Sequence, residues 1–181
     1  MAKYGVFEST NMKSTKGAER TYDVVASTDI ENGTFGYLNG LVTGETAVYN
    51  FAVGTSTGKV IVVVDQPAWN YDDSHRVNQR KDKFIIPAGT KFRVRVIAKT
   101  DEFGINDACV TAVSKSLLAK DAYLTIDSTG KLVAKATTTE SAPFEAKVLR
   151  TRKSGNTIVT TGAGTYGYTD TIYECGVITL A

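Results

Sequence analysis

Apolar and polar side chains alternate with a period of two in several short stretches of the chain. The clearest stretch is residues 91–96, KFRVRV, in which basic and apolar positions take turns. Because successive side chains of a β-strand point to opposite faces, this alternation predicts a strand with one buried face. Residues 59–65, KVIVVVD, carry a continuous apolar run instead, which predicts a strand covered on both faces.

Turn signals separate further predicted strands. Asn32-Gly33 and Asn39-Gly40 are dipeptides of the kind that close hairpins. The sequence DSTG at residues 127–130 predicts another hairpin, between strands at 124–126 and 132–134.

The second half of the chain continues this pattern. Residues 144–153 and 172–180 are predicted as strands, residues 101–107 as a loop, residues 108–113 as a strand and residues 114–122 as one short helix. The whole chain then carries about ten short strands and no amphipathic helix longer than about three turns. The predicted fold class is all-β, an antiparallel β-sandwich or barrel-like domain with an extended N-terminal arm.

The predicted arm is residues 1–20, and residues 21–181 are predicted to form the β-rich domain. The arm is polar and has few apolar side chains, namely Tyr4, Val6, Phe7 and Met12. Its charged side chains are Lys3, Lys13, Lys16 and Arg20, opposed by Glu8 and Glu19. Such a segment buries little on its own, so we expect it to become ordered on a partner, with a frayed terminus as the alternative.

Charge and composition narrow the possible partners. The net charge of +2 is close to neutral, so no specific nucleic-acid partner is expected. The longest apolar run, residues 60–64, is far shorter than the ~20 residues of a membrane-spanning helix, so no membrane partner is expected. No secretion signal is evident, and Cys109 and Cys175 are expected to be buried thiols of a protein made in a reducing cytoplasm.

Candidate catalytic chemistry is sparse. His75 is the only histidine, and its acidic and hydroxyl neighbours are adjacent in sequence, whereas triad members usually come from separate segments. The acidic residues match no calcium loop, and residues 162–164 lack the strand and helix that flank a phosphate loop. We therefore expect no catalytic residue, no metal site and no cofactor, and predict that the chain is not an enzyme.

Aromatic and basic side chains in irregular segments are the candidates for a protein interface. Trp69 and Tyr71 lie in a polar stretch, and Tyr166 and Tyr168 lie in a tip rich in Gly and Thr. Tyr and Trp commonly anchor interfaces, although they could instead fold back on their own domain. The predicted interface residues are Tyr4, Val6, Phe7, Met12, Lys13, Lys16, Arg20, Trp69, Tyr71, Arg76, Arg80, Tyr166 and Tyr168.

Besides the alternating basic positions of residues 91–95, a second group of basic side chains lies in the predicted strand at 144–153. It consists of Lys147, Arg150, Arg152 and Lys153, with no acid among residues 147–153. A solvated strand face is the commonest origin of such a pattern, contact with an acidic protein surface comes next, and contact with nucleic acid comes last.

An ordered series of short motifs resembles a known family. The series comprises residues 29–34 (DIENGT), 41–45 (LVTGE), 48–49 (VY), 71–72 (YD) and 86–94 (IPAGTKFRV). It resembles the capsid decoration proteins of tailed bacteriophages, also called cement or auxiliary head proteins. The resemblance covers about residues 22–100, with looser matches at residues 130–132 and 146–148.

This resemblance implies a function without catalysis. A decoration protein binds the outer surface of the expanded capsid shell and bridges neighbouring subunits, so the major capsid protein and other copies of the chain are the expected partners. The expected location is the capsid surface of the virion, after synthesis in the host cytoplasm. The alternatives are a tail-tube or head-fibre subunit, or a carbohydrate-binding β-sandwich that stacks sugars on Trp69 and Tyr71.

Overall fold

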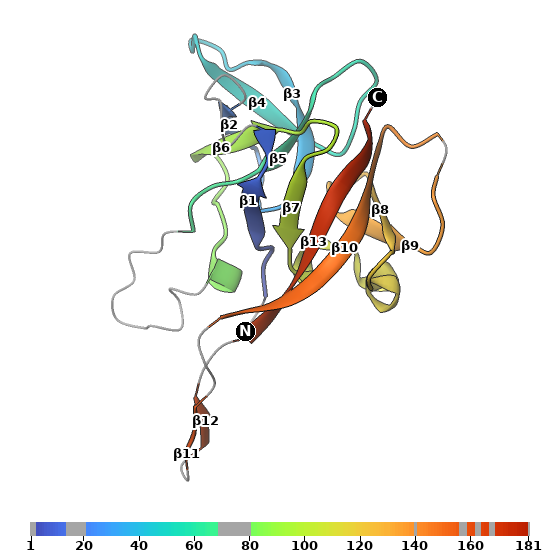
Figure 1. Cartoon of the computed structure of the whole chain (residues 1–181). Coiled ribbons are helices and arrows are strands. Elements are labelled where there is room, and N and C mark those ends of the chain that lie inside the picture. Colours follow the sequence, from blue (N-terminus) through green and yellow to red (C-terminus); the bar gives the residue numbers. More distant parts are fainter. Residues whose placement is uncertain are drawn as a thin grey trace.

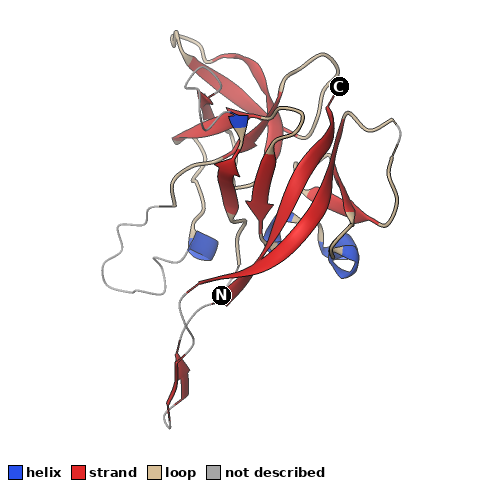
Figure 2. Cartoon of the chain, viewed as in Figure 1, coloured by secondary structure: helices blue, strands red, loops and turns tan. Residues whose placement is uncertain are grey.

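The computed structural model describes residues 3–13, 21–68, 81–139, 141–155, 159–161, 164–166 and 169–180. Regular structure within these ranges is almost entirely β-strand, with short helical turns between strands (Figure 2). The predicted all-β class is therefore confirmed. The strands are β1 (Phe7–Asn11), β2 (Thr21–Val25), β3 (Phe35–Leu41), β4 (Val48–Val53), β5 (Ile61–Val64), β6 (Lys91–Val96), β7 (Glu102–Ile105), β8 (Tyr123–Ile126), β9 (Leu132–Lys135), β10 (Phe144–Gly155), β11 (Val159–Thr161), β12 (Gly164–Tyr166) and β13 (Thr169–Leu180). The 3-10 helices are η4 (Lys81–Lys83), η5 (Asp107–Cys109) and η6 (Ala112–Leu117).

Six strands form one antiparallel sheet in the order β1-β7-β13-β10-β8-β9 (Figure 1). Its centre is the long hairpin of β10 and β13, which pair from Phe144 with Leu180 to Gly155 with Thr169. The end of this hairpin extends away from the body, toward the two-stranded ribbon of β11 and β12 (Figure 1). The predicted hairpin around residues 127–130 is confirmed as the turn between β8 and β9.

The remaining five strands close into a small barrel in the order β2-β4-β3-β5-β6. The strands β2 and β4 pair in parallel, and the other pairs are antiparallel. Apolar side chains from the alternating positions of these strands fill the barrel, including Val24, Phe51 and Phe92. The alternation in residues 91–96 therefore has the expected origin, since Phe92 and Val94 face this interior.

Strand β5 explains the continuous apolar run, because it is buried on both faces as predicted. Val62 and Val64 belong to the barrel interior, whereas Ile61 and Val63 belong to the core between barrel and sheet. Phe35 of β3 lies in the same junction, with its ring 5.9 Å from that of Phe103 and 5.3 Å from that of Phe144. One strand and one aromatic side chain thus join the two parts of the molecule.

The N-terminal prediction needs correction. Residues 7–11 form β1, the edge strand of the six-stranded sheet, where it pairs with β7. Val6, Phe7 and Met12 are buried in the core of this chain, so they are not an exposed interface. Their sequence neighbours are polar because β1 has one face on the core and the other in solvent. The predicted arm is thus part of the β-structure over residues 3–13, and residues 14–20 lie outside the described ranges.

Two local predictions are also wrong. Residues 102–105, predicted within a loop, form β7 between β1 and β13. Residues 108–113, predicted as a strand, instead contribute to η5 and η6, where Ala108, Cys109 and Val110 are buried and Val113 is exposed. Burial without alternation is what a short helical turn at the sheet edge produces, since consecutive residues can face the same core.

Candidate functional site

Two regions of the described structure combine polar or exposed side chains in ways that the fold alone does not require. One holds residues 3–13 against the body of the protein. We call it the N-terminal groove and define it by seven of the residues that bond to this segment: Glu31, Asp65, Asp82, Asp101, Asn106, Asp107 and Asp170. The other lies on the outer face of β10 and β13.

Carboxylates along the N-terminal groove accept hydrogen bonds from the backbone of the segment. The Gly5 amide donates to Glu31 Oε2 at 2.8 Å, and the Lys13 amide donates to Asp101 Oδ1 at 2.9 Å. Between them β1 pairs with the edge of β7. The groove therefore binds the segment as an extended peptide, through its backbone at both ends and through strand pairing in the middle.

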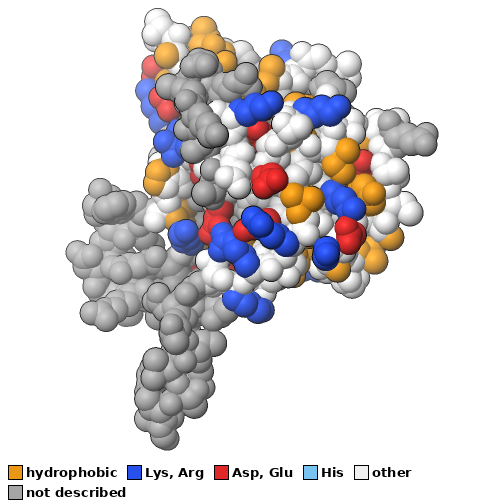
Figure 3. Space-filling model, in the orientation of Figure 1, with side chains coloured by type: hydrophobic (Ala, Val, Ile, Leu, Met, Phe, Trp, Pro, Cys, Tyr) orange, Lys and Arg blue, Asp and Glu red, His pale blue; other side chains and the backbone are white. Residues whose placement is uncertain are grey.

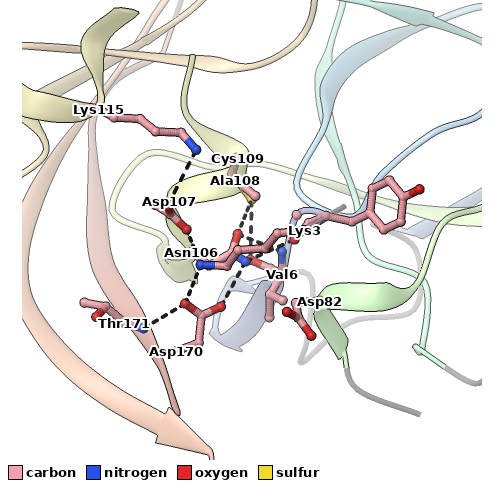
Figure 4. Close-up of polar contacts among 12 residues, drawn as sticks. Lys3, Val6, Asp82, Asn106, Asp107, Ala108, Cys109, Lys115, Asp170 and Thr171 are labelled. Atoms are coloured by element: carbon pink, nitrogen blue, oxygen red, sulfur yellow. Dashed lines mark hydrogen bonds and ion pairs between the residues drawn. The ribbon is translucent and has the colours of Figure 1, made fainter. Parts of the chain in front are cut away.

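Lys3 anchors the start of the segment in a charged cluster (Figure 4). Its Nζ contacts Asp107 of η5 and donates to Asp170 Oδ1 at 2.8 Å. Asp170, at the beginning of β13, is buried and also accepts a hydrogen bond from the Thr171 amide at 2.9 Å. Lys115 Nζ lies 3.5 Å from the other oxygen of Asp107.

Asn106 is the buried centre of this cluster. Its Oδ1 accepts the Val6 amide at 3.0 Å, and its Nδ2 donates to the Tyr4 carbonyl at 3.1 Å and to Asp170 Oδ2 at 3.0 Å. An amide side chain that satisfies both of its polar atoms in this way is stable in a buried place. Asn106 thus couples the N-terminal segment to β13 (Figure 4).

The charges of the cluster are mutually stabilised. Burial alone would raise the pKa of Asp107, but the hydrogen bond and charge of Lys3 outweigh burial and lower that pKa. Burial likewise opposes the charge of Lys3, yet its bonds to Asp107 and Asp170 raise the pKa of Lys3. Lys3 therefore stays an ammonium ion held by two carboxylates, which suits an anchor better than a nucleophile.

Cys109 lies beside the cluster but is not reactive. Burial raises the pKa of its thiol to about 12, and Cys175 is also a buried free thiol with a raised pKa. Gly33 has a φ of 76°, and a Cβ atom there would lie 2.6 Å from Cys109 Sγ. The Asn32-Gly33 turn thus packs directly on this thiol, and the expectation of two buried thiols is confirmed.

The outer face of the central hairpin exposes apolar side chains at two β-bulges. Leu149 and Ile178 are the two residues that have no partner in the register of β10 with β13. Each directly follows a buried valine and therefore points away from the core, and they are 40% and 39% exposed. The two bulges interrupt the pairing of the hairpin at these residues. We call Leu149, Ile178 and the neighbouring Lys147, Arg150 and Arg152 the hairpin surface (Figure 3).

Some cations of the hairpin surface are engaged within the chain. Lys147 lies 2.8 Å from Asp121, and Arg152 Nε lies 2.7 Å from Glu174 Oε1. Arg152 also contacts Glu8. Gly104 lies between Glu174 and Glu8 in the sheet register, and because it has no side chain, a groove remains at this place. Arg150 contacts Glu174 as well, whereas Lys153 lies on the opposite face of β10, where it donates to the hydroxyl of Thr171 at 2.7 Å.

The structure distributes the predicted interface residues unevenly. Tyr4 is half-buried in the N-terminal groove and Lys13 is exposed at its end. Tyr166 lies in β12, where its side chain is not described. The other predicted residues lie outside the described ranges: Lys16, Arg20, Trp69, Tyr71, Arg76, Arg80 and Tyr168.

Leu149 and Ile178 were not among the predicted interface residues. A sequence signal exists for both, since Val148-Leu149 and Val177-Ile178 are consecutive apolar pairs in strands that otherwise alternate. Such a doubling marks a bulge when both strands of a hairpin show it.

Within the described residues, no group of three or more His, Cys, Asp and Glu side chains could hold a metal ion. No helix in those ranges has the length and hydropathy to cross a membrane. Comparison with known proteins returned no matching protein-family model, curated sequence or solved structure. Function is therefore inferred from the residues and their geometry.

Proposed function

We propose that this chain is a non-enzymatic structural protein that binds the outer surface of a tailed-phage capsid and stabilises it by bridging capsid subunits. The observation that carries the proposal is the hairpin surface, where Leu149 and Ile178 lie at two bulges and are exposed to solvent. Exposed apolar side chains rimmed by charge are typical of protein-binding sites.

The motif series that resembles decoration proteins supports the same conclusion. It runs over about residues 22–100 and coincides with the barrel strands β2 to β6, which share a core of their own. In this proposal the barrel is the module common to decoration proteins. The six-stranded sheet then supplies the surface particular to this chain.

The chemistry of the hairpin surface defines the expected partner. Leu149 and Ile178 require an apolar patch, and the adjacent Arg150, which is 68% exposed although it also contacts Glu174, favours acidic groups at its rim. The major capsid protein is the proposed partner, and other copies of this chain sit beside it on the lattice. Many modest contacts on a closed lattice add up to strong attachment through multivalency.

Co-sedimentation tests this proposal. Purified protein is mixed with expanded and unexpanded shells of the encoding phage that lack it, and the bound fraction is measured. We expect binding to shells and a loss of at least about tenfold in affinity for the Leu149→Ser/Ile178→Ser double variant, because burying each side chain contributes roughly 1.5–3 kcal/mol.

Val60→Ser is the matched control, since Val60 is 56% exposed on the loop before β5 and outside the hairpin surface. This variant should bind like the unaltered chain. Absence of binding to both kinds of shell would overturn the proposal. Assembly of the isolated protein into rings or tubes would instead favour a tail-tube subunit.

A further inference from the structure

We propose that residues 3–13 exchange between copies of this chain, so that the N-terminal groove of one copy holds the segment of another. The groove is a built peptide-binding site that the chain fills with its own N-terminal segment. Only a second copy carries the same segment, so a second copy is the occupant that fits.

The hydrogen bonds between the segment and the body join residues that are far apart in the sequence. Lys3 bonds to Asp170, Val6 to Asn106 and Ser9 to Asp65, with separations of 167, 100 and 56 residues. None of these contacts depends on the segment being joined to the same chain. A segment from a neighbour would therefore form the same bonds, as in other exchanges of a terminal element between identical protomers.

Charge favours the segment as the ligand of this groove. Carboxylates at five positions along the groove bond to it: Glu31, Asp65, Asp101, Asp107 and Asp170. The segment presents the ammonium of Lys3 to two of them and backbone or hydroxyl donors to the others. Glu8 of the segment in turn pairs with Arg152 and Lys81, so the charges of the segment and of the residues around it are complementary.

Apolar anchors add specificity. Val6, Phe7 and Met12 are buried, and the ring of Phe7 stacks on that of Phe103 at a centroid distance of 5.5 Å. If the segment leaves, β7 becomes an unpaired sheet edge beside exposed aromatic side chains. Such an edge readily accepts a strand from another chain.

The length of the connection between the segment and β2 limits how far the segment can extend from its own chain. Eight peptide units join Lys13 to Thr21, and an extended chain of that length spans at most ~29 Å. Exchange is therefore limited to copies in close contact. Because the anchors must first leave the core, exchange in dilute solution is slow and becomes frequent at high local concentration.

Cross-strand disulfide trapping tests the exchange in the full-length chain. Asn11 of β1 is the register partner of Glu102 of β7, and both lie at the accessible end of the pairing. The variants Asn11→Cys and Glu102→Cys are mixed at high concentration, held in sub-denaturing urea, returned to buffer and mildly oxidised. We expect a disulfide-linked heterodimer whose peptide map joins residue 11 of one chain to residue 102 of the other.

Two controls make the result decisive. The double variant Asn11→Cys/Glu102→Cys should form the bond within one chain, which verifies the register. Glu102→Cys mixed with Thr57→Cys, an exposed loop position, measures collisional cross-linking. Heterodimer several-fold above this control supports exchange. Heterodimer at the control level, or none while the double variant closes, would overturn it. Shells take no part, so the outcome is independent of the capsid proposal.

Discussion

Single carboxylates in this structure pair with cations that are far away in the sequence. Asp107 and Asp170 share the ammonium of Lys3, and Glu174 on the outer face bonds to Arg150 and Arg152. The side-chain bonds of Arg150 and Arg152 lower the pKa of Glu174, as those of Lys3 lower the pKa of Asp107. Both carboxylates are thus more favourable as anions in the folded state than in the unfolded chain.

This linkage predicts acid sensitivity. A lowered folded-state pKa contributes stability above the unfolded pKa, 4.5 for Glu174 and 3.8 for Asp107, and the contribution is lost as the pH falls through the folded value. The free energy of unfolding, measured in urea from neutral pH down to about pH 3, should therefore decrease over the acidic part of this range. Asp107→Asn should be less stable than the unaltered chain at neutral pH, and the difference should shrink on acidification.

Asp23→Asn, which removes a carboxylate from an exposed position of β2, is the control for that measurement. A constant stability difference between Asp107→Asn and the unaltered chain at all pH values would contradict the assignment of Lys3 as the partner of Asp107.

Individual strands owe their positions to where their apolar side chains can be buried. The strands β10 and β13, the turn at residues 127–130 and the doubly buried strand β5 follow from the sequence, because alternation, turn residues or a continuous apolar run marks each of them. Strand β7 was missed because its sequence, EFGI, is short and contains Gly104. A glycine at this position allows Ile172 to pack against the backbone of β7, because a Cβ atom there would lie 2.8 Å from Ile172 Cγ2.

The N-terminal groove could not be predicted from sequence for a different reason. Its carboxylates stand at residues 31, 65, 101, 107 and 170, and no motif links them. Their proximity is a product of the topology, which places β1 at the edge of the sheet beside the barrel. The low apolar content of residues 1–20 suggested an arm, yet three buried side chains suffice when strand pairing accompanies them.

Among single substitutions within a strand, we expect the largest loss of stability at the junction between the barrel and the sheet. Phe35 of β3 is fully buried and packs on Phe103 and Phe144. Phe35→Ala should lower the free energy of unfolding by about 3–5 kcal/mol, as large-to-small changes in cores do. Urea unfolding monitored by circular dichroism measures this loss. Val60→Ala, at an exposed position, should change stability by no more than about 0.5 kcal/mol, and an equal loss in both variants would contradict the role of Phe35.

The whole molecule is two β-units that share one apolar junction and are also fastened by the N-terminal segment. Tyr4 bonds through its amide to the Asp82 carbonyl at 2.8 Å, on the stretch between β5 and β6, while β1 pairs with the sheet. The segment therefore bonds to both units at once. A removable arm would contact only one of them or neither.

Deletion of residues 1–13 is accordingly expected to unfold or severely destabilise the chain. It removes Val6, Phe7 and Met12 from the core, each worth roughly 1.5–3 kcal/mol when fully buried. Their sum is comparable to the ~5–15 kcal/mol that stabilises a typical domain. Thermal and urea unfolding of the truncated protein measure the effect, and Lys13→Ala, which alters only an exposed side chain, is the control. A truncated protein that keeps the unfolding midpoint of the full chain would show that the segment contributes little to stability and would contradict this expectation.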